Sequence, residues 1–515
     1  MYNNFIYQNR TIMLKTKYIC LVIFAVLILF SCKKDLGNYT YTEVNKVEFT
    51  TLGSNDTVTA IYGTRFMLKP EIKSTMDQGS DTSRYSYTWV YEGPNGLGGN
   101  ATYTYAKTKN LDVVMGLAPM GYTFYYTVTD RTTGIKFIKR FQLNVKNEIN
   151  EGWLLNTEVG GTARLDMLSK KSDGNFTLIT DLLKTTASGL ELKGKPVMVY
   201  TYSTGLLIGP DKISYGLYVG TDQTTTKINP ETFKWTKTMD LKYEMFGAIP
   251  TGFYADLIRQ AGSNAAYMLG KGNVYYYFRA LNIYYATPVN YIDIDKKSFT
   301  VAPFVANDET SSEVPAILYD QTNKRFVKHI YPAASSTTIP DPADKLFSFS
   351  TGKDLLFMNW VGFNGGEVFA VLKDPASEKR YLARFNSQTN AQSYYAEITG
   401  TGIARAEQYA ISPDLGYLFY NVGSKVYEYD MSLKTTKLML DKGNAGISLL
   451  KFQNYKSFKY KDGNKLIVCS YDPSGVDGSN GTMEQFIVPP LNADLQLSQS
   501  FTGMGKIQSI NYRER

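Results

Sequence analysis

Three features of the sequence predict an all-β protein in which an N-terminal β-sandwich is followed by a β-propeller. The 515 residues include 41 Tyr and 27 Phe against only 4 Trp, and aromatic and β-branched side chains favour the pleated surface of a sheet. Short alternations of apolar and polar residues are broken by Gly, Pro, Asn and Asp, which is typical of short strands joined by turns. From residue 151 onward, similar units recur loosely at intervals of about 50 residues, the length of a four-stranded propeller blade.

The length of the chain predicts more than one domain, because it exceeds what a single hydrophobic core serves. We expect a signal peptide over residues 1–31, a lipidated tether over 32–45, a sandwich over 46–148 and a propeller over 151–515. The formal net charge is +8, but Lys and Arg are dispersed along the chain. Nucleic-acid binding needs a concentrated basic patch, so we expect no nucleic-acid partner.

A short basic region and an apolar run indicate that the first 31 residues are a signal peptide. Met13 begins the stretch Met-Leu-Lys-Thr-Lys and is the expected true start, and the apolar run extends from Tyr18 to Phe30. This run is too short for a stable transmembrane span. Ser31-Cys32 at its end resembles a lipobox, which predicts a lipid anchor on Cys32 and stable membrane attachment through several acyl chains. The alternative is an ordinary secreted protein in which this cysteine is incidental.

Residues 46–148 are expected to form one immunoglobulin-like β-sandwich, because six alternating runs fit within about a hundred residues. The runs are 46–50, 64–68, 85–91, 111–115, 122–129 and 137–145. Trp89 lies in the middle of the third run. A mid-strand Trp in such a module predicts a core position, and the functional alternative is a sugar-binding platform at the surface.

The clearest propeller unit lies between residues 410 and 440. It contains a strand and a Pro-Asp turn in 410–420, a strand ending in Asp at 426–430, and a further strand at 437–440. Weaker echoes of this unit bring the expected number of blades to seven. Six blades remain the alternative, if two of the weaker echoes share one blade.

Several short motifs carry a resemblance to a known family. The stretches 85–89 and 121–130 resemble the polycystic-kidney-disease (PKD) type of immunoglobulin-like domain, whose later strand ends in Val-Thr-Asp. The stretches 151–168, 220–235 and 501–510, placed after a lipobox, look like the PKD-like family of Bacteroidetes lipoproteins. This resemblance implies an accessory outer-membrane lipoprotein, working beside a TonB-dependent transporter and its lid lipoprotein in the uptake of oligosaccharides or peptides.

The sequence offers few groups for catalysis. His329 is the only histidine, so two-histidine zinc and iron sites are excluded, and no Gly-x-Ser-x-Gly motif suggests a serine nucleophile. Cys469 stands alone in an apolar run and is expected to be a buried strand residue. We therefore expect a non-catalytic binding or scaffold protein. The alternative is a carbohydrate-active enzyme, a glycoside hydrolase or lyase that uses two of the 47 acidic residues.

Aromatic residues in the propeller region are the candidate ligand-binding residues. The consecutive rings around residues 275–285 must point to both sides of a strand, so half of them face away from one packed side. Rings beside a cation suit stacking on sugars or gripping a peptide. The candidates are Tyr275, Tyr277, Arg279, Tyr285 and, beside a Gly-rich loop, Trp360. The alternative is that propeller blades bury these rings between neighbouring sheets.

One oxygen-rich stretch is a candidate for calcium binding. Its flexible glycines and its Asp, Asn and Glu side chains suit Ca²⁺, although the spacing differs from that of an EF-hand loop. The candidate ligands are Asp472, Asp477, Asn480 and Glu484. A polar hairpin loop explains the same residues equally well. We expect no other cofactor.

Localisation follows from the expected anchor. An outer-membrane lipoprotein that faces the cell exterior is the leading interpretation. Surface export tends to follow acidic residues just after the lipidated cysteine, and Lys33-Lys34-Asp35 supplies only one acid. The periplasmic face of the outer membrane therefore remains the alternative.

Overall fold

A computed structural model describes residues 44–52, 56–77, 83–95, 99–171, 173–203, 215–262, 265–278, 287–457, 459–460 and 463–514. The expected signal peptide and Cys32 lie outside these residues. Within them nearly all regular structure is β-strand, which confirms the all-β class. None of the helices in the described part of the chain combines the length and the apolar character that a membrane crossing requires.

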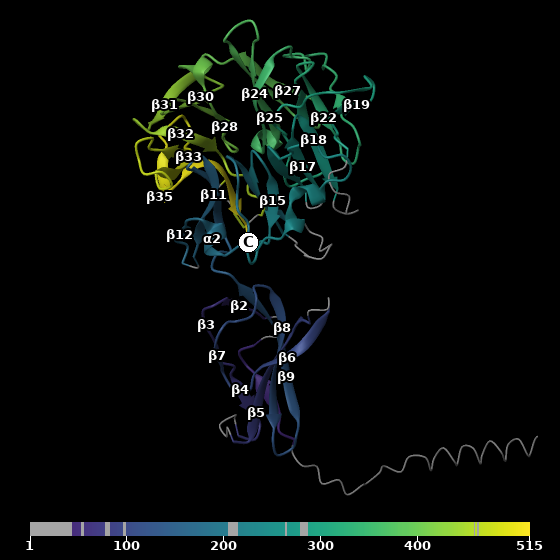
Figure 1. Ribbon diagram of the computed structural model, residues 1–515, viewed down its shortest axis with the longest axis vertical. Helices are drawn as coiled ribbons and strands as arrows, with labels where there is room; N and C mark the ends of the chain where they lie inside the picture. The colour runs from purple at the N-terminus through teal and green to yellow at the C-terminus, as the bar shows by residue number, and fades with distance from the viewer. Residues whose placement is uncertain are drawn as a thin grey trace, which may run out of the picture.

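Residues before 147 form a first body, drawn in purple and blue in the lower half of Figure 1. Its main sheet has five strands in the order β2 (Thr57–Ile61), β9 (Lys136–Lys146), β8 (Gly121–Asp130), β5 (Tyr85–Pro94) and β6 (Asn100–Ala106). Two short antiparallel ladders accompany it, β1 (Val47–Phe49) with β4 (Ile72–Ser74) and β3 (Arg65–Leu68) with β7 (Leu111–Val114). All neighbours in the main sheet are antiparallel except β2 and β9, which are parallel.

A single aromatic core holds the first body together. Buried and exposed positions alternate along β8, as the period of two of a half-buried strand requires. Trp89 on β5 is 0% exposed, and its ring centroid lies 4.2 Å from that of Tyr126 on β8. Its indole Nε1 donates a hydrogen bond of 2.8 Å to the carbonyl oxygen of Thr108. The expected core position of Trp89 is thus confirmed, and the ring is unavailable as a sugar platform.

The rest of the chain forms a second body of small sheets that follow one another around a common centre (Figure 1). The first sheet has the order β12 (Phe176–Ile179), β11 (Thr162–Lys170), β10 (Gly152–Val159) and β36 (Lys506–Arg513). Two three-stranded sheets follow, β13 (Pro196–Ser203), β14 (Tyr215–Thr221) and β15 (Thr225–Ile228), and then β16 (Leu257–Ala261), β17 (Ala265–Gly270) and β18 (Asn273–Phe278).

The remaining sheets of the second body follow in the order of the chain. They are the ladder β19 (Tyr291–Ile292) and β20 (Lys297–Ser298); the sheet β21 (Ala316–Asp320), β22 (Arg325–His329) and β23 (Thr337–Thr338); the sheet β24 (Asp354–Val361), β25 (Glu367–Lys373), β26 (Arg380–Phe385) and β27 (Gln392–Glu397); the sheet β28 (Tyr409–Ile411), β29 (Leu418–Val422), β30 (Lys425–Asp430) and β31 (Thr435–Asp441); and the sheet β32 (Gly446–Lys451), β33 (Lys465–Tyr471), β34 (Gly481–Ile487) and β35 (Gln496–Met504).

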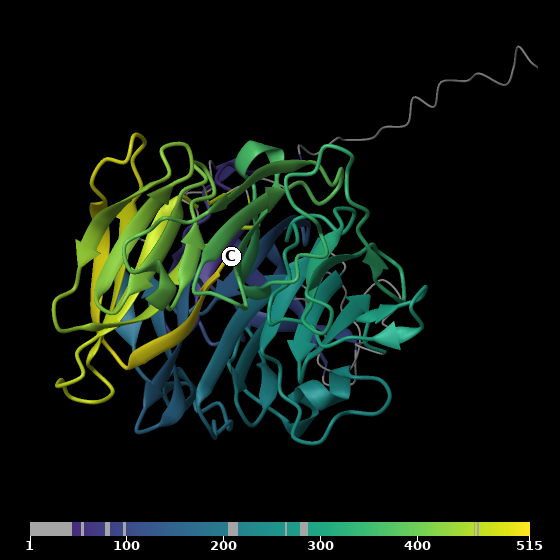
Figure 2. The same cartoon turned by 90° about the horizontal axis from the view of Figure 1, so that it is seen from above.

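Helical segments are short and lie in the connections. Among the described residues they are α2 (Leu182–Thr185) and the 3-10 turns η1 (Lys237–Met239), η2 (Leu241–Glu244), η4 (Phe363–Gly365) and η5 (Ile403–Arg405). Seen from above, the second body consists mainly of strands and loops, with a few short helical turns (Figure 2). The sheets therefore pack on one another rather than against a layer of helices.

The C-terminal strand joins the end of the second body to its beginning. β36 pairs with β10, the first strand of this body, and also contacts β13 and β32. Asn511 on β36 accepts hydrogen bonds through Oδ1 from the backbone N–H and the hydroxyl of Thr201, at 3.1 and 2.6 Å. Because the polar groups of both residues are buried and mutually satisfied, this contact fixes the position of β36 against β13.

Arg513, almost at the end of the chain, also holds the segment between the two bodies. Its guanidinium donates a hydrogen bond of 2.9 Å to the carbonyl oxygen of Ile149 and another to that of Pro230. The same group lies 5.1 Å from the ring centroid of Phe233. Arginine suits this position because its several N–H donors have a fixed geometry.

One buried acid in the second body lacks a hydrogen-bond partner. Glu428 on β30 is 2% exposed, and neither carboxylate oxygen has a partner among the described atoms. Burial raises the pKa of this carboxyl to about 7, and the charge of Lys437 only partly opposes the rise. Ionisation in a poorly solvated place without a partner is costly.

The native chain should lose stability as the pH rises, because Glu428 then ionises in a buried place. We expect Glu428→Gln to prevent this loss. The carboxyl ionises near pH 4.5 in the unfolded chain but near 7 in the fold. The stability that it contributes is therefore present below pH 4.5 and is lost as the pH rises to about 7. As the pH rises from 4.5 to 8, the free energy of unfolding of the variant should increase relative to that of the native chain by about 2–3 kcal/mol.

Denaturant unfolding at several pH values measures this difference. Glu48→Gln, an exposed change on β1, serves as the control and should leave the pH profile unchanged. A constant difference between Glu428→Gln and the native chain across this range would contradict the expectation.

Candidate functional site

A cavity of about 260 Å³ lies where the first strands of several sheets meet. Strands β13, β16, β24, β28, β32 and β36 all contribute to its wall, so it lies at the centre of the second body. We call it the inner cavity. Its polar lining residues include Asp256, Arg259, Glu309, Asn359, Lys451, Gln453, Asn454 and Ser509.

A second cavity of about 280 Å³ adjoins the first, and we call it the outer cavity. Glu309, Gln453 and Asn454 line both cavities, so the two share a wall. The outer cavity adds the aromatic rings of Trp360 and Tyr455. Aromatic walls with a few convergent polar groups are the usual composition of a small-molecule site.

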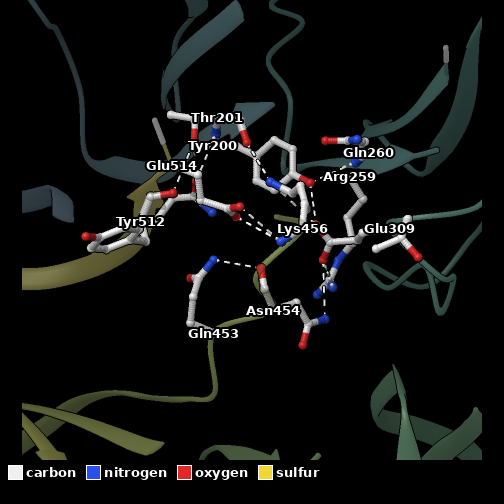
Figure 3. A network of polar contacts seen from close by, with 12 residues as sticks. Tyr200, Thr201, Arg259, Gln260, Glu309, Gln453, Asn454, Lys456, Tyr512 and Glu514 are labelled. Carbon is white, nitrogen blue, oxygen red and sulfur yellow. Dashed lines mark hydrogen bonds and ion pairs between the residues drawn. The ribbon is translucent and has the colours of Figure 1, made fainter. Parts of the chain in front are cut away.

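Glu309 is the centre of a polar cluster between the two cavities (Figure 3). It lies in a turn before β21 and is buried. Tyr200 on β13 donates a hydrogen bond of 2.5 Å to Oε2, and Lys456 Nζ lies 3.9 Å from the same oxygen. Arg259 on β16 and Asn454 approach Oε1 at 3.2 and 3.4 Å. We call these five residues the Glu309 cluster.

The cluster keeps the Glu309 carboxylate ionised. Burial alone would raise its pKa, but the charges of Lys456 and Arg259 and the hydrogen bond from Tyr200 outweigh burial and lower the pKa. Burial, followed by the nearby negative charge, raises the pKa of Tyr200 well above its usual value. The phenol therefore stays protonated and remains a hydrogen-bond donor to the carboxylate.

Two lysines near Glu309 have different surroundings. Lys456 donates a hydrogen bond of 2.7 Å to the carbonyl oxygen of Thr201, and its ammonium lies 4.6 Å from the ring centroid of Tyr200. Lys451, at the end of β32, donates a hydrogen bond of 2.9 Å to the carbonyl oxygen of Ile510. Burial and then the positive charge of Arg259 lower the pKa of Lys451 to about 8.

Several buried polar atoms around the cavities have no hydrogen-bond partner among the described atoms. Gln453, 4% exposed, donates through Nε2 to the carbonyl oxygen of Asn454 at 3.0 Å, but its Oε1 accepts no hydrogen bond. Arg259 Nε is a donor without an acceptor. Buried polar groups are nearly always satisfied in folded proteins, and unsatisfied atoms of this kind also occur away from the cavities in the described structure.

The structure places the expected ligand-binding residues in different surroundings. Trp360, at the end of β24, lines the outer cavity and packs against Gly366, where an added Cβ would lie 2.5 Å from the indole ring. Tyr275 and Tyr277 on β18 are 2% and 9% exposed, and both pack in a core cluster with residues of β13 and β17. Their rings fill the space between sheets and line neither cavity. Arg279 and Tyr285 lie outside the described residues.

The four expected calcium ligands point to separate partners. Asp472 accepts hydrogen bonds from the backbone and hydroxyl of Ser474, and Asp477 accepts one of 2.6 Å from the backbone of Gly160. These contacts are those of a polar loop.

Asn480 donates to the backbone of Asp472, and Glu484 forms an ion pair of 2.5 Å with Lys442. Across the described ranges, no group of three or more His, Cys, Asp or Glu side chains is arranged to hold a metal ion. The stretch thus brings together no cluster of acidic ligands.

His329 and Cys469 are both buried in strands. His329 on β22 contacts the hydroxyl of Tyr267 through Nδ1 at 2.8 Å and the carbonyl oxygen of Ala333 through Nε2 at 2.7 Å. Burial lowers the pKa of the imidazole, which favours its neutral form. Cys469 on β33 is 0% exposed, as expected for a small apolar core residue, and burial raises the pKa of its thiol.

Sequence reasoning did not identify the Glu309 cluster. Its members come from four separate segments between residues 200 and 456, and these segments share no motif. The available signal was Phe452-Gln-Asn-Tyr-Lys456, a polar stretch that directly follows the apolar strand β32. Only the closed arrangement of the sheets shows that this stretch meets Tyr200 and Arg259.

Comparisons with known proteins support the expected PKD-like family for the N-terminal part of the chain, and the family match ends at residue 196. The model of the PKD-like family matches residues 32–196, which include β1 to β12. No curated protein sequence matches the chain.

Three solved structures illustrate the distant structural likenesses. They are a quinonprotein alcohol dehydrogenase-like protein from Bacteroides thetaiotaomicron (10% identity, 89% of this chain and 97% of that chain covered, TM-score 0.41), a DUF4784 family protein from Bacteroides caccae (8%, 91% and 98%, 0.31) and YCF48 from Cyanidioschyzon merolae (12%, 63% and 90%, 0.36). Such low identities and TM-scores assign neither a ligand nor an activity to this chain.

We expect Glu309→Gln to destabilise the second body strongly. The change keeps the shape of the side chain but removes the carboxylate that the half-buried Arg259 and Lys456 side chains contact. Breaking a buried ion pair from one side typically costs about 3–5 kcal/mol. Thermal and denaturant unfolding of purified protein provide the measurement.

Glu313→Gln is a matched control, because this residue lies four positions along the same connection but is exposed. It should change the free energy of unfolding by less than about 0.5 kcal/mol. Equal effects of the two substitutions would show that the Glu309 cluster does not stabilise the fold.

Proposed function

We propose that this protein is a lipid-anchored binding component of a nutrient uptake system in the outer membrane, facing the cell exterior. In this proposal the sheets after residue 151 are the seven blades of a β-propeller, and the first body is a PKD-type spacer between the anchor and the propeller. The two cavities at the centre of the propeller receive an oligosaccharide or a peptide. A TonB-dependent transporter and its lid lipoprotein are the partners.

The pair of adjoining cavities is the observation that carries the proposal. The outer cavity supplies the rings of Trp360 and Tyr455, which suit stacking against a sugar ring or an apolar side chain. The shared wall supplies Gln453 and Asn454, whose amides suit hydrogen bonding to hydroxyl or peptide groups. An apolar wall and fixed polar groups together provide affinity and orientation.

The expected anchor supports the proposed location. Lipidation of Cys32 would attach the chain to a membrane, and residues 33–45 would separate the first body from the lipid surface. The family match to residues 32–196 begins at this cysteine. A binding body tethered in this way would work beside another membrane protein, which receives the captured ligand.

Co-purification tests the proposed partners. A tagged copy with the native leader, expressed in its own host and solubilised in a mild detergent, should recover a TonB-dependent transporter and its lid lipoprotein. Cys32→Ala should release the chain from the membrane fraction, because the anchor is lost, and should greatly reduce recovery of the transporter.

Folding of the released variant is checked by its unfolding curve, which should match that of the anchored protein after detergent extraction. Recovery of the tagged chain alone in several mild detergents, from cells in which the transporter is detectable, would contradict the proposal.

One observation favours the alternative of a carbohydrate-active enzyme enough to require a direct test. Asp256 and Glu309 both line the inner cavity, and their pKa values move in opposite directions: burial raises that of Asp256, whereas the Glu309 cluster lowers that of Glu309. Glycosidases use one protonated and one ionised carboxyl group. Both oxygens of Glu309, however, already have partners within the cluster.

We therefore expect binding without turnover. Incubation of the protein with mixed oligosaccharides and peptides should leave their chain lengths unchanged, as measured by mass spectrometry. The matched variant is Asp256→Asn, which keeps the side-chain shape but removes the acid. Hydrolysis by the native protein that this variant loses, with an unaltered unfolding curve, would establish the enzyme and overturn the binding role.

A further inference from the structure

We propose that the outer cavity binds the positively charged side chain of a peptide, so that the ligand carries a lysine or an arginine. This inference rests on the proposed function, because it specifies the ligand of one of the two cavities. It follows from the loops that form the outer cavity, from the sign of the charges that line it and from the aromatic rings beside them.

The outer cavity lies among loops from four parts of the second body. They are the connection before β21 (308–310), the end of β24 and the turn after it (Trp360, Gly362), the turn between β28 and β29 (Pro413, Asp414) and the segment after β32 (453–455, Tyr460, Gly463). Loops held by a rigid set of sheets are the usual carriers of ligand-binding residues. The outer cavity is therefore a place where the side chains of several sheets converge.

The charged side chains that line the outer cavity are all acidic. They are Asp308, Glu309 and Asp414, and no described lysine, arginine or histidine lines this cavity. The inner cavity differs, because its two acids face two cations, Arg259 and Lys451. A concave site lined by charges of one sign attracts ligands of the opposite sign. The outer cavity therefore favours a cation.

Two of the three acids have no counter-charge. Glu309 contacts Arg259 and Lys456 within the Glu309 cluster. Asp308 accepts hydrogen bonds through Oδ1 from the backbone N–H and the hydroxyl of Thr310, at 2.8 and 2.7 Å, and its Oδ2 takes part in neither bond.

Neither Asp308 nor Asp414 forms an ion pair with another residue of the described chain. Asp308 is half-buried and Asp414 is exposed, so both carboxylates are accessible to a ligand. A cation that enters the outer cavity would meet two negative charges that no side chain has already neutralised.

Two lysines near the outer cavity do not change this balance. Lys459 lies 5.1 Å from the ring centroid of Tyr460, but its ammonium forms an ion pair of 3.1 Å with Glu151. Lys456 contacts Glu309, and the charge of Glu514 also acts on it. Neither lysine lines the outer cavity.

Aromatic rings form another part of the wall. Trp360 is half-buried and packs against a hydrophobic core. Tyr455 and Tyr460 stack with their ring centroids 5.4 Å apart, and both make edge contacts with Tyr512. These contacts hold the rings in place. A cation beside the face of a Trp or Tyr ring is attracted to the ring as well as to a nearby carboxylate.

These residue types favour a basic peptide over a sugar. Lysine and arginine carry their charge at the end of an apolar stem, which lies on the rings while the charge reaches the carboxylates. Sugar hydroxyl groups both donate and accept hydrogen bonds, whereas carboxylates only accept them. The outer cavity, at about 280 Å³, is smaller than most sites for drug-sized ligands and suits one such side chain.

Calorimetry with matched tripeptides tests the inference. The detergent-solubilised full chain is titrated with a capped alanine-lysine-alanine peptide and with the same peptide acetylated on the lysine, which removes only the charge. The charged peptide should bind about tenfold or more tightly, because it alone gains the ion pair and the attraction to the rings. The double variant Asp308→Asn, Asp414→Asn should abolish this difference.

Three measurements keep the result interpretable. Asp344→Asn removes an exposed acid outside both cavities and should leave both affinities unchanged. The double variant should keep the native unfolding curve, because asparagine still offers the oxygen that Thr310 contacts. Trp360→Leu keeps an apolar side chain against the core but removes the ring, so it should weaken the binding of the charged peptide several-fold.

The remaining outcomes separate this inference from the proposed function. Equal affinity for the two peptides, or a double variant that acts no more strongly than Asp344→Asn, would overturn the cation site but keep a binding protein. Tighter binding of a glucosamine trisaccharide than of either peptide, lost when its amino groups are acetylated, would replace the peptide by an amino sugar. No binding of any peptide or sugar would overturn this inference alone if the transporter is recovered, and both proposals if it is not.

Discussion

A single buried carboxylate connects parts of the chain that are far apart in sequence. Glu309 meets Tyr200 from β13, Arg259 from β16 and Lys456 from the segment after β32. A charge in this place is tolerable only if every partner is present, because an isolated buried ion is very costly. The central arrangement of the sheets therefore has to be complete before the cluster is stable, and the cluster in turn favours the complete arrangement over partly assembled ones.

The same requirement explains the role of the last strand. β36 pairs with β10, and its Asn511 contacts Thr201, so β36 must be in place before the inner edge of β10 is covered. An uncovered edge would leave backbone N–H and C=O groups of β10 exposed for pairing with other chains. β36 covers this edge of β10 and also forms part of the wall of the inner cavity.

The sequence allowed the all-β class and the burial of Trp89 and Cys469 to be predicted, because these depend on local composition and alternation. Alternation was a poor guide at Tyr275 and Tyr277. In an isolated sheet one face is exposed, but here each face of β18 meets a different set of neighbours: Tyr275 and Tyr277 pack toward β13, and Tyr276 packs on the other side with Tyr267. When a strand is covered on both faces, its sequence does not indicate which ring lies outside the packed core.

The Glu309 cluster could not be predicted for a related reason. Each member is one polar residue near an apolar strand, and a solvated position is the ordinary explanation of such a residue. Their meeting depends on the closure of the whole second body, which no local pattern contains. Trp360, which is not part of this cluster, attracted attention because it lies beside a Gly-rich loop, and in the structure it lines the outer cavity.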